Sequence, residues 1–134
     1  MIGLDTNVVV RFLVQDDPAQ AAQATALIAS LTEDDPGYIS REVMVELVWV
    51  LERAYRLPRT DIAGAIDGLL SAAELVVEAP ETVGLAAERY RMGGAGFSDQ
   101  MIALGAERAG CRTTYTFDRD AQKHAGMTAV PATA

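Results

Sequence analysis

Two acidic residues follow predicted strands, at the end of a parallel sheet where ligands and catalytic residues usually lie. Asp5 and Asp118 each come directly after a short run of strand-forming residues. In a parallel sheet, ligands bind beyond the carboxyl ends of the strands, so we expect both carboxylates on one rim. For Asp5 an alternative stays open, because Asp5 and Thr6 could simply cap the helix that follows.

A third acid, Glu46, falls inside an apolar stripe of a predicted helix over residues 41–55. The stripe follows helical spacing and consists of Val43, Leu47, Val50, Leu51 and Ala54. Burying an isolated ionised carboxylate costs several kcal/mol, so an acid in this stripe needs a cation or a proton. Glu42 lies in the first turn, where the helix dipole favours an acid whatever the function. We therefore favour Glu46 as the functional acid.

A fourth acid, Asp99, is expected in the first turn of a helix that Ser98 caps. The helix dipole alone would explain an acid there. However, Asp99 would share a helix face with Ile102 and Ala106, which we expect to pack inward. The preceding glycine-rich segment, residues 93–96, could let the backbone approach a ligand or partner, but no Gly-Lys-Ser/Thr follows it as in a P-loop.

These four acids together predict a metal centre. Converging carboxylates repel one another unless they are protonated or neutralised, and they suit Mg²⁺ or Mn²⁺. Such a metal can generate a nucleophilic water and stabilise the leaving oxygen of a phosphodiester. His124, the only histidine, fits a surface cation at a helix end better than a general base. Hydrolysis would then depend on the metal.

Strands and helices are expected to alternate along the chain. The predicted strands cover residues 2–5, 38–39, 75–77, 113–117 and 128–130. The predicted helices cover residues 7–14, 19–31, 41–55, 60–73, 80–92, 98–110 and 119–124. This alternation is typical of an α/β fold with a parallel sheet covered on both faces. No repeat or linker divides residues 1–134, so we expect a single domain.

The composition limits the classes of partner and compartment. Eleven basic and nineteen acidic residues give a net charge of −8, which argues against a plain basic patch for nucleic acid. Nucleic acid is not excluded, because bound divalent cations can invert the local field of carboxylates. The single cysteine, Cys111, suits a reducing cytosol. We expect a cytoplasmic protein, because there is no basic leader and the longest apolar stretch, 43–51, contains Glu46 and is too short for a bilayer.

Four segments together resemble a known family. Residues 4–11 resemble the opening of PIN-domain nucleases, in particular VapC-type toxins. Residues 40–51 resemble the family's helix with a glutamate, 97–102 its third acidic site and 114–120 its fourth. The resemblance implies a three-layer α/β/α domain around a four- to five-stranded parallel sheet. It also implies a Mg²⁺- or Mn²⁺-dependent endoribonuclease.

The resemblance also assigns residues. The implied catalytic and metal-binding acids are Asp5, Glu46, Asp99 and Asp118. Asn7 and Thr116 match polar positions that support the site, and Asp120 is the substitute for Asp118. Ser98 stands where many relatives have alanine, which affects no catalytic position.

The resemblance further implies an RNA substrate, a cognate antitoxin that blocks the site, and a homodimer. Independently, the helix over 41–55 shows a second apolar face, formed by Met44, Val45, Val48 and Trp49. A helix that is apolar almost all round needs burial on two sides, so we expect this face to meet another subunit or an antitoxin.

Arginine makes up ten of the eleven basic residues. Its planar guanidinium suits phosphate recognition, and Arg11, Arg91 and Arg119 lie near the acidic motifs in sequence. These three are weak candidates for RNA contacts, because the arginine content could equally reflect composition bias.

Three other classes compete with a toxin. A haloacid-dehalogenase-like phosphatase would need a second aspartate two residues after the first, where this chain has Asn7. A PIN-fold RNA-processing or DNA-structure nuclease that is not a toxin would share every acid. A non-catalytic nucleic-acid-binding module is disfavoured, because the set of acids is intact.

Overall fold

The structure is a computed structural model that describes residues 1–133. Residues 1–133 contain five strands: β1 (Ile2–Gly3), β2 (Gly37–Ile39), β3 (Leu75–Val77), β4 (Tyr115–Thr116) and β5 (Thr128–Ala129). Seven helices separate them: α1 (Thr6–Leu13), α2 (Pro18–Ala29), α3 (Arg41–Arg53), α4 (Arg59–Ser71), α5 (Pro80–Arg91), α6 (Phe97–Arg108) and α7 (Arg119–His124). Every predicted strand and helix is present, with ends displaced by one to a few residues.

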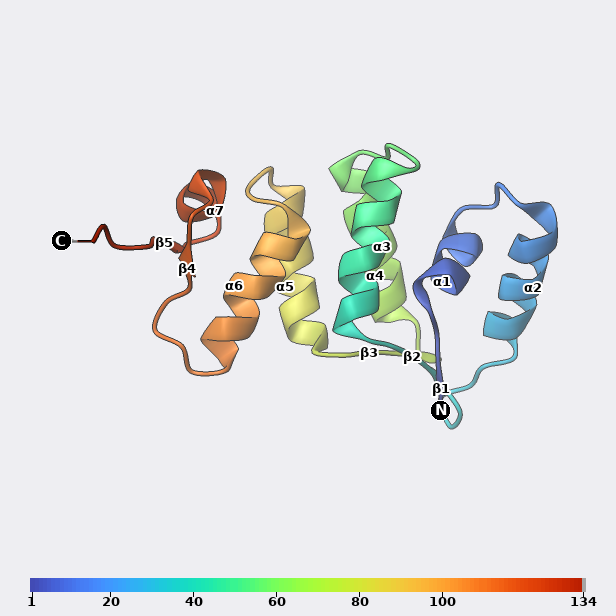
Figure 1. Ribbon diagram of the computed structural model, residues 1–134. Helices are drawn as coiled ribbons and strands as arrows, with labels where there is room; N and C mark the ends of the chain where they lie inside the picture. The colour runs from blue at the N-terminus through green and yellow to red at the C-terminus, as the bar shows by residue number, and fades with distance from the viewer. Residues whose placement is uncertain (134) are drawn as a thin grey trace.

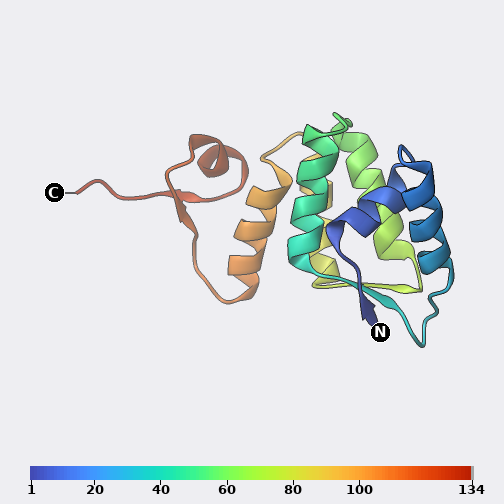
Figure 2. The same ribbon diagram turned by 45° about the vertical axis from the view of Figure 1, so that its right-hand side comes forward.

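The strands are parallel, as predicted, but they form two sheets. One sheet has the order β1-β2-β3, with Gly3 opposite Tyr38 and Tyr38 opposite Val76. The other contains β4 and β5 alone, with Thr116 opposite Ala129. Figures 1 and 2 both place this second sheet on the far side of α5 and α6 from β1. The predicted α/β class is confirmed, whereas the five strands do not form one continuous sheet.

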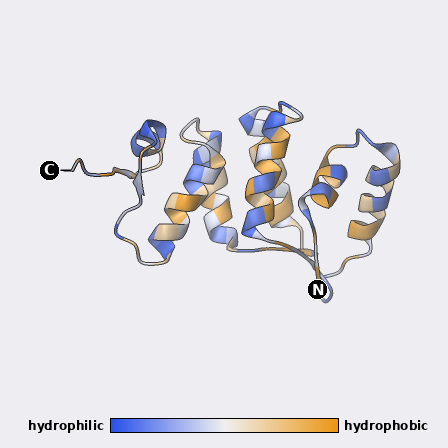
Figure 3. Cartoon of the chain, viewed as in Figure 1, coloured by the Kyte–Doolittle hydropathy of each residue, from blue (hydrophilic) through white to orange (hydrophobic). Residues whose placement is uncertain are grey.

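The three-stranded sheet and helices α1, α3, α4, α5 and α6 contribute to one large hydrophobic core. Leu47, Ile66, Tyr90 and Phe97 are almost fully buried in it. The rings of Tyr90 and Phe97 meet edge to face, with centroids 6.2 Å apart. Figure 3 shows apolar and polar residues alternating around these helices, the pattern of helices that bury one face.

A second, small apolar cluster attaches the C-terminal unit, by which we mean β4, α7 and β5. It consists of Ala95, Ala121, Ala125 and Met127, with Ala103 packed against it. The side-chain amide of Gln100 donates a hydrogen bond to the carbonyl of His124 at 3.2 Å. These contacts attach α7 to the start of α6 and to the loop before it.

The starts of α1, α2, α3 and α7 have side-chain caps, whereas α4, α5 and α6 begin without one. Asp17 and Ser40 cap α2 and α3, as predicted, by accepting from the amides of Gln20 and Val43. The predicted cap at Ser98 is wrong, because α6 already begins at Phe97 and Gly96 is its N-cap. No helix within residues 1–133 has the length and apolarity needed to cross a membrane.

Candidate active site

Asp5 lies two residues after the end of β1, caps α1 and is exposed to solvent. Its Oδ1 accepts a hydrogen bond from the amide of Thr6 at 2.8 Å. Asp5 and Glu46 line the same pocket of about 260 Å³, together with Asn7. We call Asp5 and Glu46 the N-terminal half-site. Asp5 can cap the helix and also bind a ligand, because the cap uses only Oδ1 and leaves Oδ2 available.

Glu46 is exposed, so the prediction that it lies in a buried stripe is wrong. The buried face of α3 consists of Met44, Leu47, Val48 and Leu51. Leu47 and Leu51 of the predicted stripe are buried, but Val43 and Val50 are only half-buried and Ala54 is exposed, so the buried face overlaps the predicted one and is rotated toward Met44 and Val48. Glu46 therefore borders the pocket with Asp5 without the cost of burying its charge.

Arg11 and Tyr55 complete the wall of this pocket. The Arg11 guanidinium donates to the Tyr55 hydroxyl and to Asp16 at 3.0 Å each, and to Gln20 at 2.7 Å. The hydrogen bond with Tyr55, together with the nearby charge of Asp16, raises the pKa of Arg11, while partial desolvation opposes this. The network fixes a cation beside Asp5 and Glu46. Tyr55 was not predicted from the sequence, because its pairing with Arg11 spans 44 positions and leaves no local pattern.

Asp118 caps α7 as Asp5 caps α1. Its Oδ1 accepts from the amides of Asp120 at 2.8 Å and Ala121 at 3.2 Å. The Thr116 hydroxyl accepts a hydrogen bond from the Asp118 amide at 3.0 Å, and its supporting role in a site stays a prediction. Asp120 is exposed, 3.8 Å from the imidazole of His124, and His124 is the surface residue that was predicted.

Asp99 lies in the first turn of α6 and is close enough to this cap to feel its charges. Partial burial raises the pKa of Asp99, and the negative charges of Asp118 and Asp120 raise it further. We call Asp99, Asp118 and Asp120 the C-terminal half-site. The expectation that Ile102 packs inward beside Asp99 is wrong, because Ile102 is 56% exposed.

The two half-sites do not meet within one chain. Within residues 1–133, no three or more His, Cys, Asp or Glu residues come close enough together to hold a metal ion. The prediction that Asp5 and Asp118 share one rim is therefore not met. The physical reason is that β4 pairs only with β5, while the alanine-rich cluster holds α7 against α6.

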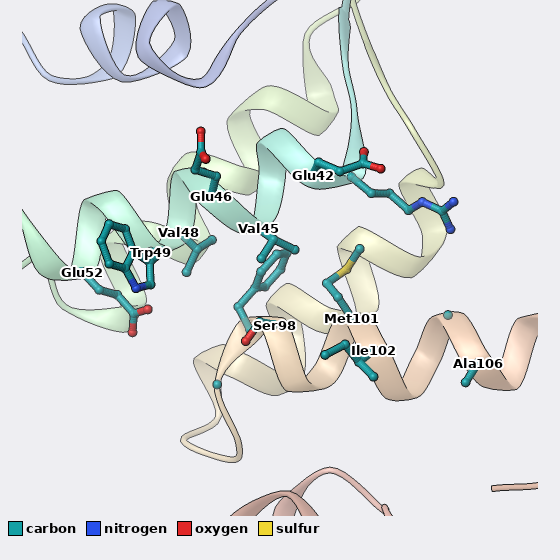
Figure 4. A pocket seen from close by; sticks show the side chains of 14 residues that line it. Glu42, Val45, Glu46, Val48, Trp49, Glu52, Ser98, Met101, Ile102 and Ala106 are labelled. Carbon is teal, nitrogen blue, oxygen red and sulfur yellow. The ribbon is translucent and has the colours of Figure 1, made fainter. Parts of the chain in front are cut away.

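A largely apolar groove of about 840 Å³ lies between α3 and α6, and Glu46 is among its lining residues. Val45, Trp49, Met101 and Ile102 line it, and Figure 4 shows their side chains on its two walls. Met44 and Val48, which were expected on a second apolar face of α3, are instead part of the core. The unburied part of that face is thus Val45 and Trp49, the latter 57% exposed.

The two other arginines predicted near the acids differ in their surroundings. Arg91 is paired with Asp67 and Glu88, on the side of α5 that meets α4. Arg119 is exposed and follows Asp118 directly, at the start of α7. Arg119 thus lies next to an acidic half-site, and Arg91 is engaged in structural ion pairs.

The donor chemistry fits a hard divalent cation. All the acids of both half-sites supply carboxylate oxygens, which Mg²⁺ and Mn²⁺ prefer. Burial first, and then the negative charges of Asp118 and Asp120, raise the pKa of Asp99, and a bound cation would offset the charge repulsion. Each half-site alone supplies a partial set of ligands.

Comparison with known proteins agrees with the motifs. The model of the PIN domain family matches residues 2–127. Among curated proteins, none matches the chain significantly. A crystal structure of Mycobacterium tuberculosis VapC20, described as a Sarcin-Ricin loop cleaving toxin, is similar over 97% of this chain and 98% of its own. The sequence identity is 22% and the TM-score is 0.45.

Proposed function

This chain belongs to the PIN domain family, and we propose that it is a Mg²⁺- or Mn²⁺-dependent endoribonuclease. PIN domains are typically metal-dependent nucleases. The observation that supports the proposal best is the shared pocket of Asp5 and Glu46, which is open to solvent and bordered by an arginine. Asp99 and Asp118 would complete the set of acids. Both lie in first turns or caps of helices, where backbone amides tolerate negative charge.

In this proposal the four acids would bind the cation, and neighbouring backbone amides orient two of these acids. When bound, the cation supplies the activated water and the charge stabilisation for hydrolysis of a phosphodiester. The amide of Thr6 orients Asp5, and the amides of Asp120 and Ala121 orient Asp118. Asn7 borders the pocket of Asp5 and could position a phosphate oxygen or a water through its side-chain amide.

The RNA backbone would be held by local cations, since the net charge of −8 opposes any general attraction. Arg11 is fixed beside Asp5 and Glu46 by its hydrogen bonds, so its guanidinium could meet a phosphate with little loss of conformational freedom. Arg119 is the matching candidate beside Asp118.

The finer part of the proposal is that the protein is the toxin of a type II toxin–antitoxin pair. A cognate antitoxin would bind the chain and block the acids. Growth arrest on expression of this chain, relieved by co-expression of the adjacent open reading frame, would support this role. Efficient RNA cleavage by purified protein without growth arrest would support a processing nuclease instead.

The cleavage assay uses purified chain, a mixed RNA substrate and Mg²⁺ or Mn²⁺. We expect cleavage that a chelator abolishes, and losses on the order of 100-fold or more in Asp5→Asn and Asp99→Asn, because each removes a metal ligand. Glu81→Gln is the matched control, since this exposed acid forms only a surface ion pair with Arg108. Wild-type activity in either Asn variant would refute the assigned acids.

A further inference from the structure

The two half-sites and two open sheet edges suggest how the site is completed. We propose that β4 of one copy of this chain pairs with the open edge of β1 in a second copy. Each active site then combines Asp5 and Glu46 from one copy with Asp99 and Asp118 from the other. The inference rests on the proposed nuclease function.

The first open edge belongs to β1, which ends its sheet and pairs only with β2. The amides of Ile2 and Leu4 donate to the carbonyls of Pro36, just before β2, and Tyr38 in β2, so the N–H and C=O of Gly3 point away from β2. A Cβ built on Gly3 would meet nothing within 4 Å. Ile2 and Gly3 are both exposed, whereas in β2 and β3 the first and last residues are buried.

The second open edge belongs to β4. The carbonyls of Thr114 and Thr116 accept from the amides of Thr128 and Val130 in or next to β5. By the alternation of a strand, the backbone groups of Tyr115 therefore point to the opposite, unpaired side. Tyr115 is 51% exposed and Phe117 85% exposed, which is a large apolar surface for a strand of this length.

Parallel pairing of these edges brings the acids together. Gly3 offers one donor and one acceptor, which match the carbonyl of Tyr115 and the amide of Phe117 and place Gly3 opposite Thr116. Asp5 and Asp118 each follow by two residues, so this register puts them side by side at the carboxyl ends of adjacent strands. No other pairing of the open edges aligns these two acids directly.

Pairing of β4 with β1 of a second copy is favoured over pairing with β1 of the same chain, because the C-terminal unit is attached to α6. The apolar cluster and the hydrogen bond from Gln100 to His124 hold α7 against the start of α6. Figures 1 and 2 show the helices of the large core between β4 and β1 of the same chain. Intramolecular pairing would break these contacts, whereas pairing with another copy keeps them.

The exchange is reciprocal, so two copies close on each other with two-fold symmetry, and the β1 and β4 edges of both copies are paired. The exposed backbone edges of β1 and β4 would otherwise be free to pair with other chains. The acids brought together carry like charges, and a divalent cation between them offsets the repulsion. The metal and the second copy are thus required together.

Cross-linking tests the pairing without any dependence on activity. Gly3→Cys and Thr116→Cys are placed in separate, differently tagged copies, each with Cys111→Ser, and the copies are co-expressed and treated with a short bismaleimide. We expect a covalent heterodimer that carries both tags. Gly3→Cys with Glu81→Cys is the control pair and should give little product.

Placing both cysteine substitutions in one chain separates the alternatives. The proposal predicts dimers linked between copies. Cross-links within a single chain, with no heterodimer from the separate copies, would overturn it and would show that the chain closes on its own β1.

Complementation tests the shared site. Asp5→Asn and Asp99→Asn, each inactive alone, are co-expressed. If copies assort at random, about a quarter of the composite sites regain all four acids, so we expect about a quarter of wild-type cleavage. Asp5→Asn with Glu46→Gln should give no recovery, because both changes lie in the same half-site.

No recovery from Asp5→Asn with Asp99→Asn, while the wild type is active, would overturn the shared site and leave the nuclease function intact. An inactive wild type would overturn the nuclease function, and the cross-links would still decide the pairing.

Discussion

The region around β1-β2-β3 and the C-terminal unit differ in how they are stabilised. The first buries a continuous cluster of large side chains from five helices, from β2 and β3, and from Leu4 after β1. The second is attached through three alanines and Met127, and its only helix has six residues. Alanine buries little apolar surface and a helix this short is unstable alone, so the C-terminal unit depends on contacts made elsewhere. The acids are divided between these two regions.

The largest effect is expected in the core of the first region. Ile66 is fully buried in α4, so Ile66→Ala should lower the free energy of unfolding by about 2–5 kcal/mol. Urea denaturation followed by circular dichroism measures this. Leu85→Ala is the matched control, because Leu85 is 42% exposed on α5, and it should cost less than about 1 kcal/mol. Equal losses in both variants would mean that the core is misassigned.

A smaller and local effect is expected from Met127→Ala. Met127 is the one large side chain in the cluster that attaches the C-terminal unit, so its loss should weaken that attachment by about 2 kcal/mol. Hydrogen exchange should accelerate in residues 115–129, while the urea midpoint of the large core stays near that of the wild type. Acceleration spread evenly over the whole chain would show that the two regions unfold as one.

The smallest effect on stability separates Asp118 from Asp120. Asp118→Ala removes a cap that two amides use, so α7 should lose about 1 kcal/mol of local stability and RNA cleavage should fall. Asp120→Ala removes only a distant contact with His124 and should change hydrogen exchange of α7 little. If Asp120→Ala abolished cleavage and Asp118→Ala did not, Asp120 would be the fourth acid.

Local features of the fold were predictable from the sequence, and pairing over long distances was not. Ser40 and Asp17 gave the helix starts because capping depends on neighbouring residues. Glu46 was assigned to a buried stripe because α3 is apolar nearly all round, so helical spacing fits more than one face. The division into two sheets had no sequence signal, since strands of two or three residues leave their pairing to tertiary contacts.

The candidate site was predictable as a set of residues, while its arrangement was not. Asp5 and Asp118 were identified because each follows a strand, and the structure places both there as helix caps. Their separation follows from the attachment of α7 through small alanines, which no periodic pattern marks.

The central claim is that acids from both regions bind one divalent cation. Mn²⁺ titration of the wild type, Asp5→Asn and Asp99→Asn by calorimetry tests it most directly, without RNA. The account predicts that each substitution weakens Mn²⁺ binding by on the order of 10- to 100-fold, although the two residues lie in different regions. Wild-type Mn²⁺ affinity in either variant would contradict it.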